Sequence, residues 1–334
     1  MALWPVYTGS GTPHDGISRL PPPPPWRAFD GAPVLDPPGE SDAAAASPDR
    51  VHRAETYRAT PQTVQLVNAA LYLRRPLLVT GPPGTGKSSL VYAVARELRL
   101  GPVLRWNITS RSTLHDGLYQ YDPLSRLYAA RHAQATSEAG IEDHLRLGPL
   151  GTALLPYARP RALLIDEIDK SDLDLPNDLL NVLEEGQYEI PELVRGARRT
   201  PTAEVMIDGT DERVPVERGR VRCRAFPFVV LTSNGEREFP PAFLRRCVTL
   251  RLRQPDDGQL MAIVRAHFDG EPDTYAQTLI DRFLSRVGGG ELATDQLLNA
   301  IYLARSSDLG SKSLDDLAEQ LMPYLGDAPH TDAF

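Results

Sequence analysis

The stretch GPPGTGKS, residues 81–88, decides the fold class of this chain. It matches GxxxxGK[ST], a pattern in which a glycine-rich turn joins a buried strand to the start of a helix. PLLVT at 76–80 is a short apolar run typical of such a strand, and SSLVYAVARELRL at 88–100 is typical of the following helix. Because both neighbours are present, the stretch predicts a phosphate-binding loop rather than a glycine turn without a ligand.

The residues of this loop predict how ATP would be held. Gly81, Gly84 and Gly86 let the backbone wrap so that its N–H groups point inward, and the helix start adds its positive end. Lys87, also an expected catalytic residue, would reach the β- and γ-phosphates, and Ser88 would ligate Mg²⁺. The complete expected nucleotide-binding set is Gly81, Pro82, Pro83, Gly84, Thr85, Gly86, Lys87, Ser88 and Ser89.

Two carboxylates end the apolar run of LLIDEID, residues 163–169. At a strand end beside the phosphate loop, Asp166 is expected to hold Mg²⁺ through water, and Glu167 to polarise the attacking water. Asp169 and Lys170, which follow, are expected to form a solvated helix start rather than catalytic groups.

Two asparagines follow other predicted strands. Asn234 comes directly after FVVLTS, where its amide could orient the water between Glu167 and the γ-phosphate. Asn107 lies near the end of the strand predicted at 102–109. It either hydrogen-bonds Glu167 and holds it back, or serves as a turn or cap residue; the sequence leaves both open.

The order of the elements predicts an α/β fold. Strands alternate with helices as far as Arg253, which implies a mostly parallel sheet covered on both faces. From Gln254 onward the pattern is wholly helical. The expected domains are a Pro/Gly/Ala-rich arm at 1–55, a core at 56–254, a helical lid at 255–325 and a tail at 326–334.

The arm at 1–55 is too poor in apolar residues to fold alone, so it is expected to be mostly disordered or loosely docked. Two aromatic pieces within it, WPVY at 4–7 and PWRAF at 25–29, could instead dock on a neighbouring subunit or partner.

Charge and composition narrow the classes of partner. The net charge is −8, so the surface as a whole repels nucleic acid and anionic membranes, and neither is expected as a partner. The two cysteines lack metal or redox spacing, which fits a reducing cytoplasm. No signal peptide and no membrane span are expected. Basic residues are nearly all arginine, so the three lysines, Lys87, Lys170 and Lys312, stand out.

Taken in order, the phosphate loop, the Asp166–Glu167 pair, Asn234 and PAFLRRC at 241–247 resemble the AAA+ ATPases. The likeness is greatest to the MoxR-like group, the helix-2-insert type, in which IDEIDKS, DLLNVLEEG and PAFLRRC recur in similar form. It covers residues 57–305. It implies a P-loop NTPase αβα core with a five-stranded, mostly parallel sheet, a C-terminal α-helical lid, and a ring homo-oligomer, usually a hexamer.

The resemblance also assigns roles to particular residues. Arg246 would reach the γ-phosphate bound by the neighbouring subunit, with Arg245 as a second contact. The arginine that many relatives place at the start of the third lid helix is missing from GGGELATDQLLNA at 288–300; Arg305 comes later, and Arg286 is a weak candidate. The adenine is expected to lie near residues 57–60.

Two segments that the MoxR-like group adds to the core fold also have counterparts in this chain. An insert in the second helix is expected between Ala133 and Leu150, and a hairpin is expected at 204–219 with DGTDE as its turn.

The resemblance implies an ATPase that remodels or activates a partner protein, possibly one with a von Willebrand factor A domain. Two alternatives remain: a nucleic-acid motor or restriction-type NTPase subunit, and a slow ATP-gated scaffold or switch. The acidic balance of the chain weighs against the first alternative.

Overall fold

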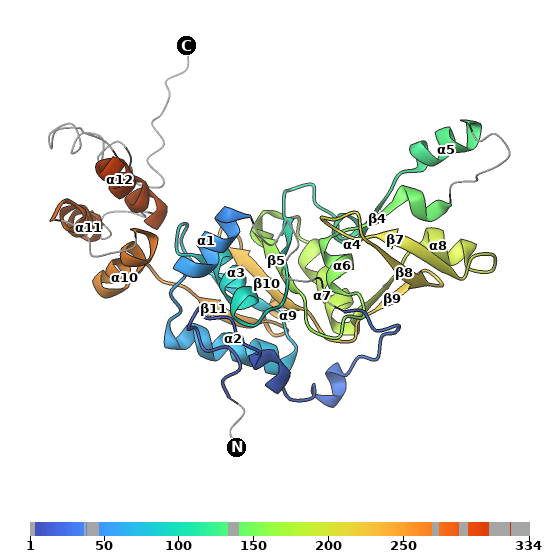
Figure 1. Ribbon diagram of the computed structural model, residues 1–334, viewed down its shortest axis with the longest axis horizontal. Coiled ribbons are helices and arrows are strands. Elements are labelled where there is room, and N and C mark those ends of the chain that lie inside the picture. Colours follow the sequence, from blue (N-terminus) through green and yellow to red (C-terminus); the bar gives the residue numbers. More distant parts are fainter. Residues whose placement is uncertain are drawn as a thin grey trace, which may run out of the picture.

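The computed structural model describes residues 4–36, 38, 47–132, 140–268, 274–286, 293–306 and 321. At its centre lies a sheet of five strands, all parallel, in the order β11-β1-β10-β5-β2 (Figure 1). Its strands are β1 Leu77–Thr80, β2 Leu104–Asn107, β5 Ala162–Asp166, β10 Phe228–Ser233 and β11 Val248–Arg251. The α/β fold expected from the sequence is therefore confirmed.

Helices cover both faces of this sheet because its inner strands are apolar on both faces. Successive side chains of β1 point to opposite sides, so that Leu77 and Val79 join one core cluster while Leu78 joins the other. One face packs against α2 and α3, and the other against α6 and α7. These helices are α2 Pro61–Leu73, α3 Lys87–Glu97, α6 Pro149–Ala153 and α7 Leu175–Glu185.

Local capping sets the ends of two of these helices. The side chain of Thr60 accepts a hydrogen bond from the N–H of Thr63 at the start of α2, and Pro61 occupies its first turn. Gly186 ends α7 in the left-handed conformation, which glycine adopts without steric cost. Both boundaries could be read from the sequence because caps depend on neighbouring residues alone.

A second sheet of six short strands, in the order β3-β4-β7-β8-β9-β6, lies beside the first. Its strands are β3 Tyr119–Tyr121, β4 Leu145–Leu147, β6 Gln187–Glu189, β7 Thr202–Met206, β8 Arg213–Glu217 and β9 Arg220–Arg222. The predicted hairpin is confirmed as β7 and β8, with Met206 opposite Arg213. The sheet as a whole was not anticipated, because three-residue strands carry too little periodicity to be recognised.

The segment around the expected insert projects from this sheet (Figure 1). The departure from the core begins earlier than residue 133, since β3 already pairs with β4 in antiparallel fashion. Between them lie α5, Pro123–His132, and the 3-10 turn η3, Ile141–His144. Pro123 begins α5 rather than breaking a helix, because proline is favoured in the first turn. Residues 133–139 of the expected insert lie outside the described residues.

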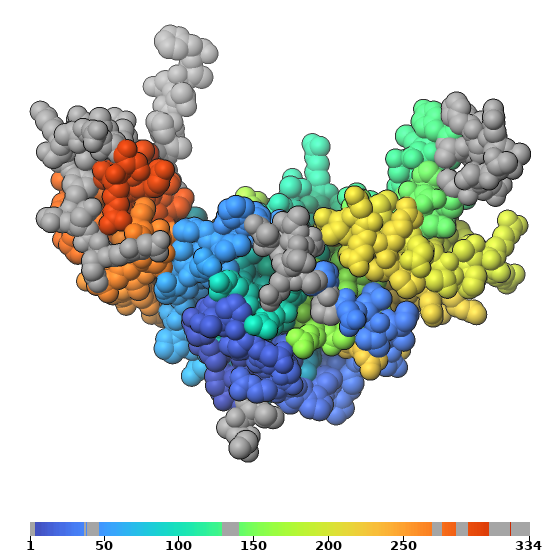
Figure 2. Space-filling model, viewed as in Figure 1, coloured from blue at the N-terminus to red at the C-terminus, as the bar shows by residue number. Residues whose placement is uncertain are grey.

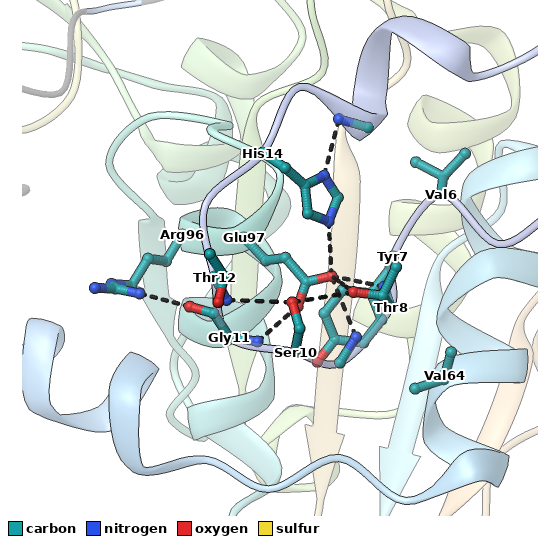
Figure 3. A network of polar contacts seen from close by, with 12 residues as sticks. Val6, Tyr7, Thr8, Ser10, Gly11, Thr12, His14, Val64, Arg96 and Glu97 are labelled. Atoms are coloured by element: carbon teal, nitrogen blue, oxygen red, sulfur yellow. Dashed lines mark hydrogen bonds and ion pairs between the residues drawn. The ribbon is translucent and has the colours of Figure 1, made fainter.

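The first part of the N-terminal arm packs on the core instead of standing free (Figure 2). Val6 and Tyr7 are buried, and both of their N–H groups donate to Oδ1 of Asn68 on α2. Glu97 at the end of α3, itself fully buried, accepts hydrogen bonds from the following loop at Thr8, Gly9 and Gly11 (Figure 3). This part of the arm is held by hydrogen bonds to polar side chains on α2 and α3. A prediction based on apolar runs in the sequence does not detect such contacts.

The second aromatic piece also packs on this chain. Arg27 donates to the carbonyl oxygens of Leu183 and Glu184 at the end of α7, and Phe29 stacks on Phe226 with ring centroids 5.8 Å apart. Leu35 then forms a parallel bridge with Tyr157. The pieces 4–7 and 25–29 were singled out as able to dock on a neighbouring subunit or partner, whereas in the structure both pack on their own chain.

Three helices form the described part of the lid around their own apolar cluster. They are α10 Asp257–Phe268, α11 Thr274–Arg286 and α12 Thr294–Ser306. A fourth helix expected at 313–325 lies outside the described residues except for Leu321. The remaining elements are η1 Gly16–Arg19, η2 Pro25–Arg27, α1 Pro48–Thr56, α4 Leu114–Leu118, η4 Ile168–Lys170, α8 Pro191–Gly196 and α9 Pro241–Leu244.

Candidate functional site

A cleft of about 1050 Å³ lies between the core and the lid. Its floor is the phosphate loop, and one wall is made of side chains at the carboxyl ends of β5 and β10. The other walls come from residues 56–63 and from lid helices α10 and α12. Ligands of open parallel sheets bind at the carboxyl ends of the strands, so this cleft is the candidate site.

The phosphate loop has the backbone conformation that its glycines permit. Gly81, Gly84 and Gly86 have φ values of +151°, +74° and +81°, a region that other residues enter only with strain. Gly86 immediately precedes α3, whose first residue is Lys87. The loop therefore ends at a helix N-terminus that opens into the cleft, the arrangement required for anion binding.

Lys87 lies folded over this loop. Its Nζ donates to the carbonyl oxygens of Gly81 at 2.7 Å and Pro82 at 2.8 Å. Thr85 Oγ1 also donates to the carbonyl of Pro82, at 2.9 Å. The ammonium is thus positioned at the loop, where bound phosphate oxygens would compete with these neutral carbonyls for a charge-assisted hydrogen bond.

Asp166 is the centre of a polar cluster on β5. Its Oδ1 accepts from Ser88 Oγ at 2.7 Å and from Thr232 Oγ1 at 2.6 Å, and its Oδ2 accepts from Arg105 at 2.8 Å. Burial by itself raises the pKa of Asp166, but the hydrogen bonds from Thr232, Ser88 and Arg105 together lower it below its ordinary value. Asp166 is therefore held ionised beside Ser88, its predicted partner in metal binding.

Glu167 follows in the left-handed backbone conformation, with φ of +63°. A non-glycine residue at such a φ is strained, and strain of this kind gathers at functional sites. Its N–H donates to Thr232 Oγ1 at 2.9 Å, which fixes the backbone at the cleft wall. The carboxylate, 43% exposed, accepts from Lys170 Nζ at 2.8 Å. Lys170, rather than Asn107, is thus the residue that holds Glu167.

Asn234 lies at the cleft, at the end of β10, on a loop held by Asp169. A single carboxylate oxygen of Asp169 accepts the N–H groups of Asn234, Gly235 and Glu236, at 2.9, 3.1 and 3.2 Å. Asp169 is only 3% exposed, so the expectation of a solvated helix start was wrong for this residue. Three converging backbone donors stabilise a buried carboxylate, and the carboxylate in turn positions Asn234.

Arg245 and Arg246 lie away from the cleft and are absent from its lining. Arg246 Nε donates to Glu184 Oε1 at 2.7 Å, and its Nη1 donates to the carbonyl of Ala242 at 3.3 Å. Arg245 Nε donates to the carbonyl of Pro241 at 3.3 Å. Neither arginine is therefore placed to meet a phosphate bound by its own chain.

The lid touches the phosphate loop at the start of α12. A Cβ built on Gly84 would lie 2.7 Å from both the Cβ of Ala293 and the N–H nitrogen of Thr294. Arg305, at the far end of α12, stacks on Phe268 instead. Of the other expected lid residue, Arg286, only the backbone is described. In place of an arginine, Thr294 and Asp295 face the cleft.

Another wall of the cleft carries the segment expected at the adenine. Residues 57–60 line it together with Ile263 and His267 of α10. Tyr57 lies beside the phosphate loop, since a Cβ on Gly86 would come within 3.3 Å of its ring, and burial raises the pKa of Tyr57 to about 12. This tyrosine stays neutral and offers an apolar ring face at the cleft wall.

Sequence reasoning missed several residues of the site: Arg105, Thr232 and the structural role of Asp169. Each contacts a partner more than 60 positions away. Thr232 carried a faint signal, as a polar residue within the otherwise apolar run of its strand. Arg105 carried none, since an arginine on an edge strand is commonly a solvated residue.

Among the described residues, no helix combines the length and apolar character needed to cross a membrane.

Comparisons with curated proteins show partial relatives. The chain is 30% identical over 216 residues to the gas vesicle ATPase GvpN1 of Halobacterium salinarum, which covers 62% of this chain and 54% of that protein. It is 32% identical over 122 residues to an ATP-dependent protease ATP-binding subunit-like protein of Rhodococcus erythropolis, which covers 35% and 31%. The chain thus spans about half the length, or less, of these curated relatives.

Two solved structures are similar at low identity. A protein of Cytophaga hutchinsonii shares 15% identity with a TM-score of 0.37, covering 65% of this chain and 53% of that one. NtrX from Brucella abortus, solved in complex with ADP, shares 14% with a TM-score of 0.34, covering 79% and 54%. At such scores neither likeness carries an argument.

The family comparison covers the site itself. Residues 76–247 match the AAA domain (dynein-related subfamily), a span of more than half of the 334 residues. The span contains the phosphate loop, the Asp166–Glu167 pair and Asn234, the groups that the structure gathers at one cleft. The chain therefore belongs to the AAA domain family, dynein-related subfamily, and its core is an ATPase domain.

Proposed function

We propose that this chain is a MoxR-like AAA+ ATPase that works as a ring homo-oligomer, a hexamer, to remodel or activate a partner protein. The observation that carries the proposal is the separation of two sets of groups. Lys87, Glu167 and Asn234 line the cleft, whereas Arg245 and Arg246 lie outside it. Because Arg245 and Arg246 lie outside the cleft of their own chain, we assign them to the cleft of a second copy.

Each residue of the cleft has a role in this proposal. Lys87 binds the β- and γ-phosphates, Glu167 accepts the proton of the attacking water, and Asn234 orients that water. Ser88 and Asp166, a hydroxyl and an ionised carboxylate 2.7 Å apart, are oxygen donors suited to Mg²⁺. When bound, Mg²⁺ neutralises charge on the phosphate oxygens.

In this proposal Arg246 supplies a further positive charge to the neighbouring cleft, in trans, beside the Lys87 of that cleft. Its ion pair with Glu184 is 43% and 39% exposed, so breaking it costs at most about 1 kcal/mol. An arginine supplied in trans accelerates phosphoryl transfer by about 10³- to 10⁵-fold. The gain in transition-state stabilisation therefore far exceeds the free energy needed to break the ion pair with Glu184. Arg246 can accordingly leave Glu184 and reach the neighbouring cleft. Arg245 provides a second contact at the same interface.

The projecting segment between β3 and β4 is proposed as the part that meets the partner protein, in the manner of the helix-2 insert of MoxR-like ATPases. Leu124, Leu127 and Tyr128 follow helical spacing on α5, and all three are exposed. Exposed apolar residues on one helix face favour a protein partner, possibly one with a von Willebrand factor A domain. The relative named as a gas vesicle ATPase supports the ATPase part of this proposal.

A mixing experiment tests the shared site. Glu167→Gln and Arg246→Ala are each expected to bind ATP nearly normally and to lose hydrolysis. When equal amounts are mixed, a cleft with intact Glu167 meets a neighbour with intact Arg246 in about one quarter of the interfaces of a closed ring. Turnover should therefore recover to about one quarter of wild type.

The control for this experiment is Arg199→Ala, which removes an exposed arginine far from the cleft lining and should leave turnover unchanged. Mixed rings that form but stay inactive would contradict a finger supplied in trans. Full turnover by a monomer would contradict the ring itself.

A further inference from the structure

We propose that Lys170 is a positioning residue that holds the carboxylate of Glu167 in an idle position and releases it by moving to Glu236. The inference deepens the proposed function, since it rests on Glu167 accepting the proton of water. It concerns one of only three lysines in the chain.

The pairing of Lys170 with Glu167 follows from local backbone geometry. Glu167 immediately precedes η4, and the N–H of Lys170 donates to the carbonyl of Glu167 at 2.9 Å. In a 3-10 turn, side chains three positions apart lie one above the other. Because Thr232 also fixes the N–H of Glu167, only the side chain of Glu167 is left to move.

The ion pair engages the carboxylate of Glu167 from the side of a second cavity. A second cavity of about 620 Å³ lies on the other side of Glu167, and Glu167 is the one described residue that lines both cavities. Lys170 lines the second cavity but not the nucleotide cleft. With Oε2 bonded to Lys170 at 2.8 Å, one of the two carboxylate oxygens is engaged by a residue of the second cavity and is not free to accept a proton from a water at the γ-phosphate.

Glu236 offers Lys170 an alternative partner in the same cavity. It lines this cavity, and among the causes that raise the pKa of Lys170, after the hydrogen bond from Glu167 and the charge of Glu167, is the charge of Glu236. The other carboxylate nearby, Asp169, is buried, and its charge raises the pKa of Lys170 less than the charge of Glu236 does. The remaining cation of the cavity, Arg237, donates to the carbonyl of Ser171. Glu236 is thus the carboxylate best placed to receive Lys170.

Glu236 also lies on the loop that carries Asn234, the residue that orients the attacking water in the proposed mechanism. A small shift of this loop on ATP binding brings Glu236 toward Lys170 and frees Glu167. The ion pair is about 42% exposed on each side, so its strength is modest and the transfer requires little free energy.

Two substitutions with opposite expected signs test the inference in the full chain. Lys170→Met removes the restraint and should raise kcat for ATP about two- to fivefold, the range expected for an exposed ion pair, with KM unchanged. Glu236→Gln removes the alternative partner and should lower kcat by a similar factor. Lys170→Arg, which keeps the positive charge, should restore kcat to near wild type.

The double variant distinguishes positioning from a general effect on folding. If Glu236 acts through Lys170, Glu236→Gln should have no effect in the Lys170→Met background. Glu238→Gln is the matched control, because Glu238 is an exposed carboxylate on the same loop that lines neither cavity. Thermal unfolding should be the same in all variants.

A fall in kcat for Lys170→Met at unchanged thermal stability would overturn the inference, as would equal effects of Glu236→Gln in both backgrounds. Turnover of Glu167→Gln distinguishes failure of the proposed role of Glu167 from failure of the proposed role of Lys170. Retained turnover in that variant would overturn the role of Glu167 and this inference together. Lost turnover in Glu167→Gln with unchanged kcat in Lys170→Met would overturn this inference alone.

Discussion

Within the N-terminal arm, the loop after Tyr7 is expected to be anchored by the carboxylate of Glu97, and Glu97→Gln is the substitution that tests this. Glu97 is fully buried on α3. Its Oε1 accepts from the N–H and hydroxyl of Thr8, at 2.6 and 2.8 Å, and from the N–H of Gly9 at 3.2 Å. Its Oε2 accepts from the N–H of Gly11 at 2.9 Å, and His14 Nε2 lies 3.1 Å from Oε1 (Figure 3).

The magnitude follows from these contacts. Glutamine keeps one carbonyl oxygen for Thr8 and Gly9, but its NH₂ group then meets the N–H of Gly11 donor to donor. A hydrogen bond to a charged group contributes about 1.5–3 kcal/mol, and a buried unpaired donor costs about 1–3 kcal/mol. The variant should therefore weaken attachment of the arm by about 2–4 kcal/mol. This corresponds to an equilibrium constant for local opening of the arm that is about 30- to 800-fold larger.

Hydrogen exchange of the backbone amides of residues 6–14 measures this opening, with urea unfolding as the measure of global stability. Glu55→Gln is the matched control, since the pair of Glu55 with Arg96 is 49% and 33% exposed and should contribute less than about 1 kcal/mol. If exchange in the Glu97→Gln arm changed no more than in Glu55→Gln, the carboxylate would not be the anchor.

Two further predictions concern the cleft. Gly84→Ala would place a Cβ at a residue with φ of +74°, 2.7 Å from the Cβ of Ala293. The variant should therefore bind a fluorescent ATP analogue about tenfold more weakly or worse. An unchanged affinity would contradict this and would show that the lid moves aside without cost. Arg105→Ala removes one of the hydrogen bonds that lower the pKa of Asp166 against the raising effect of burial. Because Asp166 acts ionised, its pKa should rise and the acid limb of kcat/KM should move to higher pH; a pH profile identical to wild type would contradict this role.

Local sequence was sufficient for the nucleotide site itself. GPPGTGKS at 81–88 is contiguous, and its glycine φ values and the helix start at Lys87 follow from residues next to one another. The Asp166–Glu167 pair and Asn234 could be placed because parallel strands end at one edge of the sheet. The hairpin of β7 and β8 was also predicted, from the resemblance to the MoxR-like group and from its contiguous turn DGTDE.

Other features were decided by contacts between distant positions. The arm looked unable to fold because its composition is poor in apolar residues, yet Asn68 and Glu97 supply the polar partners that its backbone needs. Asp169 looked solvated because its partners, the N–H groups of residues 234–236, lie 65 to 67 positions further along the chain.

The sequence by itself therefore determined the conformation of the glycine-rich loop, since a loop between a strand and a helix carries its own geometry in consecutive residues. Only the tertiary structure decided that Lys170 holds Glu167 and that Arg246 faces away from its own cleft. A side chain's direction depends on which strands and helices pack around it, and periodicity along the chain carries no information about that packing.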